Sequence, residues 1–212
     1  MSNSGRFIVL EGIDGSGTTT QLEALALRFR ELGRTVVTTR EPTSGPVGAL
    51  LRRILTGSID AGEGAGSFDW MTLALLFAAD RAHHAHNVIR PNLEQGHVVI
   101  CDRYDLSSRI YQSLTAPDAD VARPWVSTLN ACVPRPDITF VLQVDAEVAE
   151  QRRAARGGKP ELFEQSALQR RLAEAYAQAQ VYVPNDRLAH VSGDRPVGQV
   201  TELLFAGCAS IL

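Results

Sequence analysis

A glycine-rich segment, GIDGSGTT at residues 12–19, joins an apolar run to a helical pattern. The apolar run at residues 7–11 is short and ends at the glycines, which predicts a buried strand. From Thr18 onward, apolar residues recur at helical spacing as far as Leu32, and Gly33 stands at the stop position. A strand, a glycine loop and a helix in this order let backbone N–H groups and a helix N-terminus surround phosphate oxygens. The segment therefore predicts a phosphate-binding loop in an α/β fold.

The spacing of the glycines separates two kinds of nucleotide-binding loop. Gly12, Gly15 and Gly17 give G-x-x-G-x-G, whereas dinucleotide-binding folds need G-x-G-x-x-G, so a Rossmann oxidoreductase is disfavoured. The P-loop pattern fits, with Thr18 where the usual lysine stands and Thr19 where a hydroxyl contacts Mg²⁺. A glycine turn without any ligand is the alternative for such a loop standing alone.

The rest of the chain alternates apolar strand patterns with helical ones. A short helix is expected at residues 47–55, and one long core helix is expected over residues 68–93. Further buried strands are expected from Val36 up to Arg40 and at residues 98–101, 138–144 and 188–191. This alternation predicts a parallel sheet covered by helices on both faces.

Composition limits the class of protein. A length of 212 residues predicts a single domain over residues 1–212, and a net charge of −3 disfavours nucleic acid as a partner. The first residues are too polar for a secretory signal, and no segment is apolar enough to suggest a membrane. The three cysteines are far apart, so neither a disulfide framework nor a zinc site is indicated. We expect a cytoplasmic protein.

Several ordered motifs together resemble the thymidylate kinase family. They are GIDGSG at residues 12–17, TREP at 39–42, FAADR at 77–81, DRY at 102–104, and Ser107-Ser108 leading to Tyr111-Gln112. The resemblance implies a three-layer P-loop kinase fold with a five-stranded parallel sheet and a small lid at about residues 152–163. It also implies transfer of the γ-phosphoryl group of ATP, with Mg²⁺, to dTMP, which gives dTDP.

Arginines at element ends are the expected phosphate ligands of the acceptor. The resemblance places Arg81 on the dTMP phosphate, and a guanidinium can bind phosphate oxygens in pairs. Arg40 and Arg103 each end a predicted strand, where ligands collect in open parallel sheets, and are assigned to phosphates as well. Phe77 lies one helical turn before Arg81, which puts base and phosphate contacts on one helix face.

Other acceptor contacts come from the resemblance alone. Phe77 is implied to stack on thymine and Ser108 to hydrogen-bond its edge. Asp14 is implied to face the sugar 3′-hydroxyl, and Tyr111 to crowd the 2′ position. The predicted acceptor set is Asp14, Arg40, Phe77, Arg81, Arg103, Ser108, Tyr111 and Gln112.

Donor and metal binding are expected at the glycine loop and the third strand. The predicted ATP contacts are Gly12, Ile13, Asp14, Gly15, Ser16, Gly17, Thr18, Thr19 and Thr20. Asp102 closes the strand at residues 98–101 as a Walker B-like carboxylate, so Mg²⁺ is expected at Thr19 and Asp102, with Glu41 in its outer shell. Since Thr18 removes a cation, lid residues are expected to supply one; the predicted catalytic set is Asp102, Arg103, Arg153, Arg156 and Lys159.

Three functions remain open at this stage: a dTMP kinase, a kinase of another deoxynucleoside monophosphate, and a nucleotide-binding relative with weak or no activity. The acceptor motifs favour the first. A homodimer is also expected, because the helix from Phe68 carries apolar residues in more directions than one sheet face can cover. Family resemblance points the same way.

Overall fold

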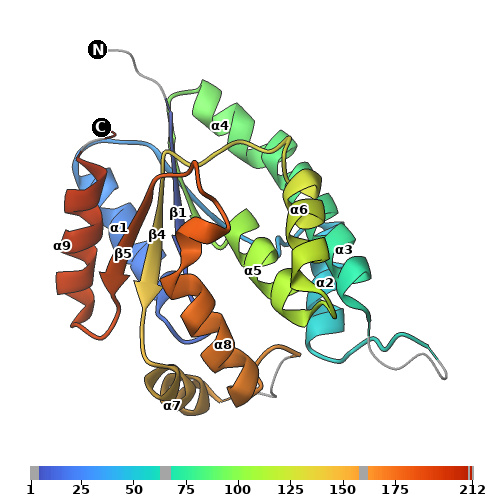
Figure 1. The fold of residues 1–212 in the computed structure, drawn as a ribbon. Helices are drawn as coiled ribbons and strands as arrows, with labels where there is room; N and C mark the ends of the chain where they lie inside the picture. Colours follow the sequence, from blue (N-terminus) through green and yellow to red (C-terminus); the bar gives the residue numbers. More distant parts are fainter. Residues whose placement is uncertain (1–4, 63–67, 158–161, 210, 212) are drawn as a thin grey trace.

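A computed structural model describes residues 5–62, 68–157, 162–209 and 211. In these residues five parallel strands form one sheet in the order β2-β3-β1-β4-β5 (Figure 1). They are β1 (Arg6–Glu11), β2 (Val36–Arg40), β3 (Val98–Asp102), β4 (Ile138–Gln143) and β5 (Leu188–Ser192). All five strand predictions are confirmed, and so is the α/β fold class.

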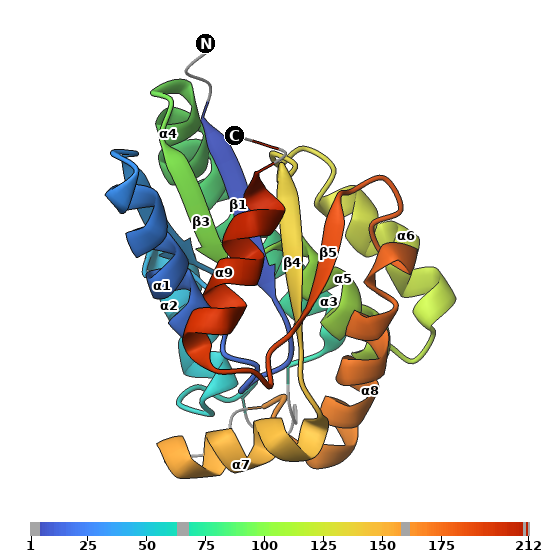
Figure 2. The ribbon, with the colours of Figure 1, turned by 90° about the vertical axis from the view of Figure 1, so that its left-hand side faces the viewer.

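Helices cover both faces of the sheet, because the central strands are apolar on both sides. Ile8 and Leu10 of β1 pack with α1 (Thr18–Glu31) and α9 (Val197–Cys208), which lie side by side in Figure 2. Phe7 and Val9 face the opposite way. The other helices are α2 (Pro46–Leu55), α3 (Trp70–His84), α4 (Arg90–Glu94), α5 (Asp105–Thr115), α6 (Ala119–Leu129), α7 (Ala146–Arg156) and α8 (Ser166–Ala177).

The long helix expected over residues 68–93 is interrupted. It begins as α3, after Asp69, whose side chain accepts from the backbone N–H groups of Met71 and Thr72. A π-helical segment, Ala85–Ile89, then leads into α4. Proline has no N–H and its ring crowds the preceding turn, so Pro91 accounts for the change: Arg90 N–H reaches back to the carbonyl of Ala85.

The parallel register brings the carboxyl ends of the strands to one edge of the sheet. Leu10 of β1 pairs with Asp102 of β3, and Arg40 of β2 pairs with the same aspartate. Figure 1 shows the arrows of β4 and β5 pointing toward α7, which lies beyond this edge. Ligands of open parallel sheets bind at such an edge. Among the described residues, no helix has both the length and the apolar character needed to span a bilayer.

Candidate active site

The glycine loop turns sharply between β1 and α1. The φ values of Gly12, Gly15 and Gly17 are 156°, 91° and 97°. Residues other than glycine rarely adopt this region. A Cβ at Gly15 would also lie 2.5 Å from the carbonyl oxygen of Ala149 in α7. The loop therefore needs glycine at Gly15 both for its own conformation and for the close approach of α7.

Thr19 and Asp102 meet beside the loop. The Thr19 hydroxyl donates to Asp102 Oδ2 at 2.5 Å. Within the described part of the chain, Asp102 Oδ1 is buried without a hydrogen-bond partner. A hydroxyl beside a carboxylate with an unused buried oxygen suits Mg²⁺. This ion prefers oxygen ligands, and several of them are usually oxygens of water molecules or of a substrate phosphate. The residues present therefore fit the expected metal.

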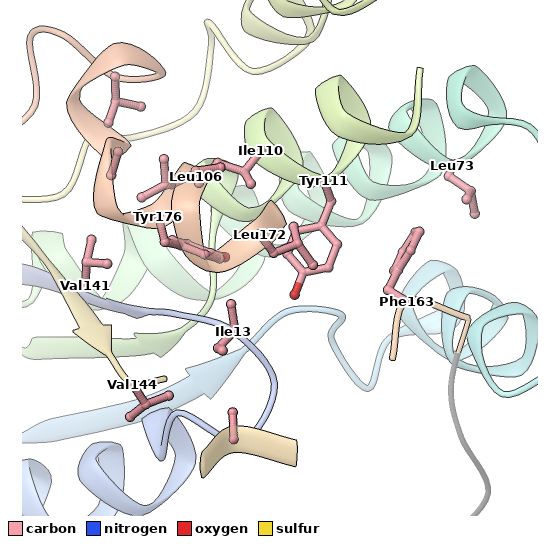
Figure 3. Packing of buried hydrophobic residues seen from close by; sticks show 14 of the residues in the cluster. Ile13, Leu73, Leu106, Ile110, Tyr111, Val141, Val144, Phe163, Leu172 and Tyr176 are labelled. Atoms are coloured by element: carbon pink, nitrogen blue, oxygen red, sulfur yellow. The ribbon is translucent and has the colours of Figure 1, made fainter. Parts of the chain in front are cut away.

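Next to the loop lies a cavity lined by most of the predicted acceptor residues. Its predicted members are Asp14, Phe77, Arg81, Arg103, Ser108, Tyr111 and Gln112. Glu41, Pro42, Leu55, Tyr104, Ser107 and Phe163 line it too. Two of these residues, Tyr111 and Phe163, lie next to one another in Figure 3, with ring centroids 5.2 Å apart. The cavity offers aromatic rings and a small set of polar groups, as nucleotide sites do.

Arg103 lies between the cavity and the glycine loop. Its Nη2 donates to Asp14 Oδ1 at 2.7 Å, and its guanidinium carbon lies 5.7 Å from the Tyr111 ring centre. Burial alone would lower the pKa of Arg103, but Tyr111 and Asp14 raise it well above the ordinary arginine value. The side chain is 18% exposed, so a charged guanidinium remains accessible to a ligand.

Arg81 is buried and hydrogen-bonded to other protein groups, which the sequence did not predict. It is 1% exposed, and its Nε donates to Glu41 Oε2 at 2.8 Å. Its Nη1 donates to Asn130 Oδ1 at 2.5 Å, and its Nη2 to Ser108 Oγ at 2.9 Å and to a backbone carbonyl. With these donors taken, a paired contact with a phosphate would require breaking protein bonds. The geometry does not favour the predicted phosphate role.

Glu41 is directed to cationic and imidazole partners rather than to the metal site. Its Oε2 accepts from Arg81, and its Oε1 lies 2.9 Å from His84 Nδ1. The other ring nitrogen of His84 lies 2.7 Å from Thr39 Oγ1. Both carboxylate oxygens are thus engaged, and the predicted outer-shell role of Glu41 is not supported.

Arg40 does not line the cavity beside the glycine loop. Successive strand residues point to opposite sides, so when Glu41 turns inward Arg40 turns out. Arg40 is exposed and lines a separate groove with Arg52 and His83. The structure does not bring this predicted phosphate ligand to the others.

Arg152 and Arg153 of α7 contact carbonyl oxygens of the glycine loop. Arg152 donates to the carbonyl oxygen of Gly15 at 3.5 Å and to that of Gly193, after β5, at 3.1 Å. Arg153, which is 9% exposed, donates to the carbonyl oxygen of Asp14. Lys159 and the side chain of Arg156 lie outside the described residues. Thr18 is the buried first residue of α1, and Thr20 is exposed in the same turn.

Two buried polar residues at the site were not predicted from the sequence. Glu11 reads as the end of an apolar strand, yet its carboxylate is fully buried behind Arg103, and burial raises its pKa although Arg103 and hydrogen bonds from Ser107 oppose this. Gln169 of α8 donates to Asp14 Oδ2 at 3.2 Å. For Glu11, the one signal in the sequence was a charged residue at the end of an apolar run. For Gln169, the sequence contains no such signal.

Comparison with known proteins agrees with these features. The thymidylate kinase family model matches residues 10–203. The chain is 40% identical over 187 residues to a probable thymidylate kinase of Pyrococcus horikoshii, covering 88% of each chain. It is 38% identical over 212 residues to the thymidylate kinase of Pelobacter propionicus, covering 95% of this chain and 93% of the relative. With a family model that matches residues 10–203 and relatives about 40% identical over most of its length, this chain belongs to the thymidylate kinase family.

Proposed function

We propose that dTMP binds in the cavity beside the glycine loop and accepts a phosphoryl group there. As a thymidylate kinase, the chain transfers the γ-phosphoryl group of ATP to dTMP. The observation that carries the proposed site is Arg103, a charged and accessible guanidinium that lies between the cavity and the loop. ADP release should be measured with a panel of nucleoside monophosphates. Turnover with dTMP well above all others is expected; equal turnover, or none, would contradict the proposal.

The base and sugar are proposed to lie along the cavity wall. Phe77 offers a half-buried ring face for thymine, and Ser108 and Gln112 offer polar groups for its edge. Within the described residues, Gln112 Oε1 is buried without a partner, as a group awaiting a ligand donor would be. Tyr111 is proposed to exclude a 2′-hydroxyl.

The acceptor phosphate is proposed to bind Arg103 rather than Arg81. Arg103 still faces the cavity, whereas the donors of Arg81 are taken by Glu41 and its other partners. Asp14 holds the guanidinium from the loop side, so the acceptor phosphate and the donor loop lie on either side of one cation. Positioning and charge neutralisation of this kind supply most of the catalysis in phosphoryl transfer.

At the donor end, the backbone of the glycine loop and the N-terminus of α1 are proposed to bind the ATP phosphates. Thr19 and Asp102 would hold Mg²⁺, which when bound neutralises phosphate charge. Because Thr18 supplies no cation, we propose that lid residues Arg153, Arg156 and Lys159 provide one. A lid over about residues 152–163 remains a prediction.

A homodimer is also proposed. Met71 and Leu75 lie one turn apart on α3 and are 49% and 51% exposed, and Leu50 on the adjacent α2 is 38% exposed. An apolar face of this kind suits a second copy of the chain. Light scattering at micromolar concentration should give a dimer mass; a monomer mass would contradict this. All three cysteines are free thiols, which suits the cytoplasmic location that we propose.

A further inference from the structure

Glu11, the last residue of β1, places a fully buried carboxylate behind the candidate site. Its Oε1 accepts from the backbone N–H of Tyr104 at 2.8 Å and of Ser107 at 3.1 Å. Its Oε2 accepts from the Ser107 hydroxyl at 2.6 Å and the Tyr176 hydroxyl at 2.9 Å. A buried carboxylate engaged on both oxygens holds the segment that carries those donors.

The two backbone contacts lie at the start of α5. Tyr104 is the N-cap of this helix and makes no capping bond with its own side chain. The first N–H groups of a helix have no partner within it, and a cap side chain usually accepts from the third helical residue, which is Ser107 here. Glu11 therefore caps α5 from a different element of the fold. The helix N-terminus in turn favours a negative charge at that point.

The capped turn begins with Arg103. This residue has a φ of 68°, in the left-handed region that residues other than glycine adopt only at a cost in free energy. Its N–H donates to the carbonyl oxygen of Leu10 at 2.9 Å, and the next N–H, of Tyr104, goes to Glu11. The end of β1 thus fixes the backbone on both sides of the Arg103 side chain.

We infer that Glu11 is a positioning residue: it fixes the strained turn after β3, and through that turn it aims the guanidinium of Arg103 at the phosphate of the acceptor. This inference rests on the proposed function, which places the dTMP phosphate at Arg103. Glu11 itself is not among the residues that line the cavity. Ser107 and Tyr176, whose hydroxyls lie 3.3 Å and 3.4 Å from Arg103 Nη1, continue the connection from Glu11.

The test compares Glu11→Leu with Glu11→Gln, because only the glutamine keeps an oxygen for both backbone N–H groups. The affinities of dTMP and of thymidine, which lacks the phosphate, are measured by titration calorimetry for each variant. Glu11→Leu should weaken dTMP binding by about tenfold or more, the size of a lost charge-assisted contact, and leave thymidine binding unchanged. Glu11→Gln should keep the dTMP preference within about threefold of wild type.

Two further variants separate positioning from general damage to the fold. Asp105→Asn alters another buried carboxylate on the first turn of α5, but Asp105 binds Arg109 and Arg135 instead, so it should leave the ratio of dTMP to thymidine affinity unchanged. Adding Arg103→Ala to Glu11→Leu should weaken dTMP no further than Arg103→Ala alone, since both act through one guanidinium. If Glu11→Leu does not fold, Glu11→Asp, which withdraws the oxygens by one methylene, replaces it in both comparisons.

The inference is overturned if Glu11→Leu weakens dTMP and thymidine equally, or if its losses and those of Arg103→Ala simply add. Failure of the proposed function gives a different result. In that case wild type does not phosphorylate dTMP, or Arg103→Ala leaves dTMP affinity unchanged, before any Glu11 variant is considered. Wild-type turnover and the Arg103→Ala titration are therefore measured first.

Discussion

At the cavity proposed for dTMP, both lining arginines are held by carboxylates of the protein: Arg81 by Glu41 and Arg103 by Asp14. The glycine loop differs, because residues 12–20 contain no basic side chain. Arginines reach this loop from other elements: Arg103, after β3, donates to the Asp14 carboxylate, and Arg153 of α7 donates to the carbonyl oxygen of Asp14. The cavity carries its own cations, whereas the loop depends on other elements for them.

The two regions therefore differ in how they would bind a negatively charged phosphate group. A guanidinium fixed by a carboxylate of the protein is already in place before the ligand arrives, so little ordering cost remains when the ligand binds. A cation supplied by α7 is useful only while α7 lies against the loop. We therefore expect substitutions at the cavity to affect stability and dTMP affinity, and substitutions at the donor end to affect turnover.

The largest effect is expected for Arg81→Ala, and on stability rather than binding. Removing one partner of a buried ion pair leaves the other charge without compensation, which costs about 3–5 kcal/mol. Arg81 and Glu41 are 1% and 3% exposed, so this case applies. Urea unfolding should show a fall of that size in the free energy of unfolding.

The control is Arg81→Met combined with Glu41→Gln, which removes both charges and should recover a large part of the loss. A variant Arg81→Ala with the stability of wild type, but with lost dTMP affinity, would restore the phosphate role predicted from the sequence and would remove the contrast with Arg103.

Arg103→Ala should have the next largest effect. Loss of a charge-assisted contact to phosphate is worth about 1.5–3 kcal/mol, so dTMP affinity should fall about 10- to 150-fold. Arg40→Ala is the matched control, because Arg40 is exposed and lines a different groove. Titration calorimetry of both variants with dTMP checks this. An equal loss in the two would mean that the cavity does not hold the acceptor phosphate alone.

Local patterns were sufficient to predict the five strands of the sheet, although not the interruption of the helix expected over residues 68–93. The apolar run at residues 7–11 and the glycines after it predicted β1 and its loop, and Asp102 at the end of an apolar run was placed correctly beside Thr19. Both inferences depend on neighbouring residues and on the rule that parallel strands share one ligand edge. No partner from a distant segment had to be known.

The partners of buried polar side chains could not be predicted in this way. Arg81 meets Glu41 and Asn130 only because α3, the end of β2 and the end of α6 converge in the fold, and their sequence separations are 40 and 49 residues. For the same reason Glu11 was correctly predicted as the end of a strand, but its contacts with Tyr104, Ser107 and Tyr176 were not predicted. A pattern shows that a polar residue lies near a ligand edge, but not whether protein or ligand satisfies it.

A smaller effect is expected when the lid loses its cations. Replacing Arg153, Arg156 and Lys159 by alanine should lower kcat about tenfold, because transition-state charge at the loop is then less neutralised, while dTMP affinity stays near that of wild type. Arg170→Ala, an exposed arginine on α8, is the control. Steady-state kinetics with both substrates varied measures the change. Unchanged kcat in the triple variant would show that the lid does not replace the missing lysine.

The smallest effect is expected for Thr18→Lys. A lysine at this position brings a cation to the β- and γ-phosphates, but if lid residues already supply one, the gain in kcat should be only a few-fold, or about 1 kcal/mol in the activation barrier. The decisive measurement is kcat for Thr18→Lys in the wild-type background and in the lid triple variant. Compensation predicts a larger gain in the second, since the added lysine then has no competing cation. Equal gains in both would mean that loop and lid act independently. If wild type is inactive and Thr18→Lys restores turnover, the donor end of the natural protein binds nucleotide without catalysing transfer. The glycine loop and the cavity would then differ in activity as well as in the source of their cations.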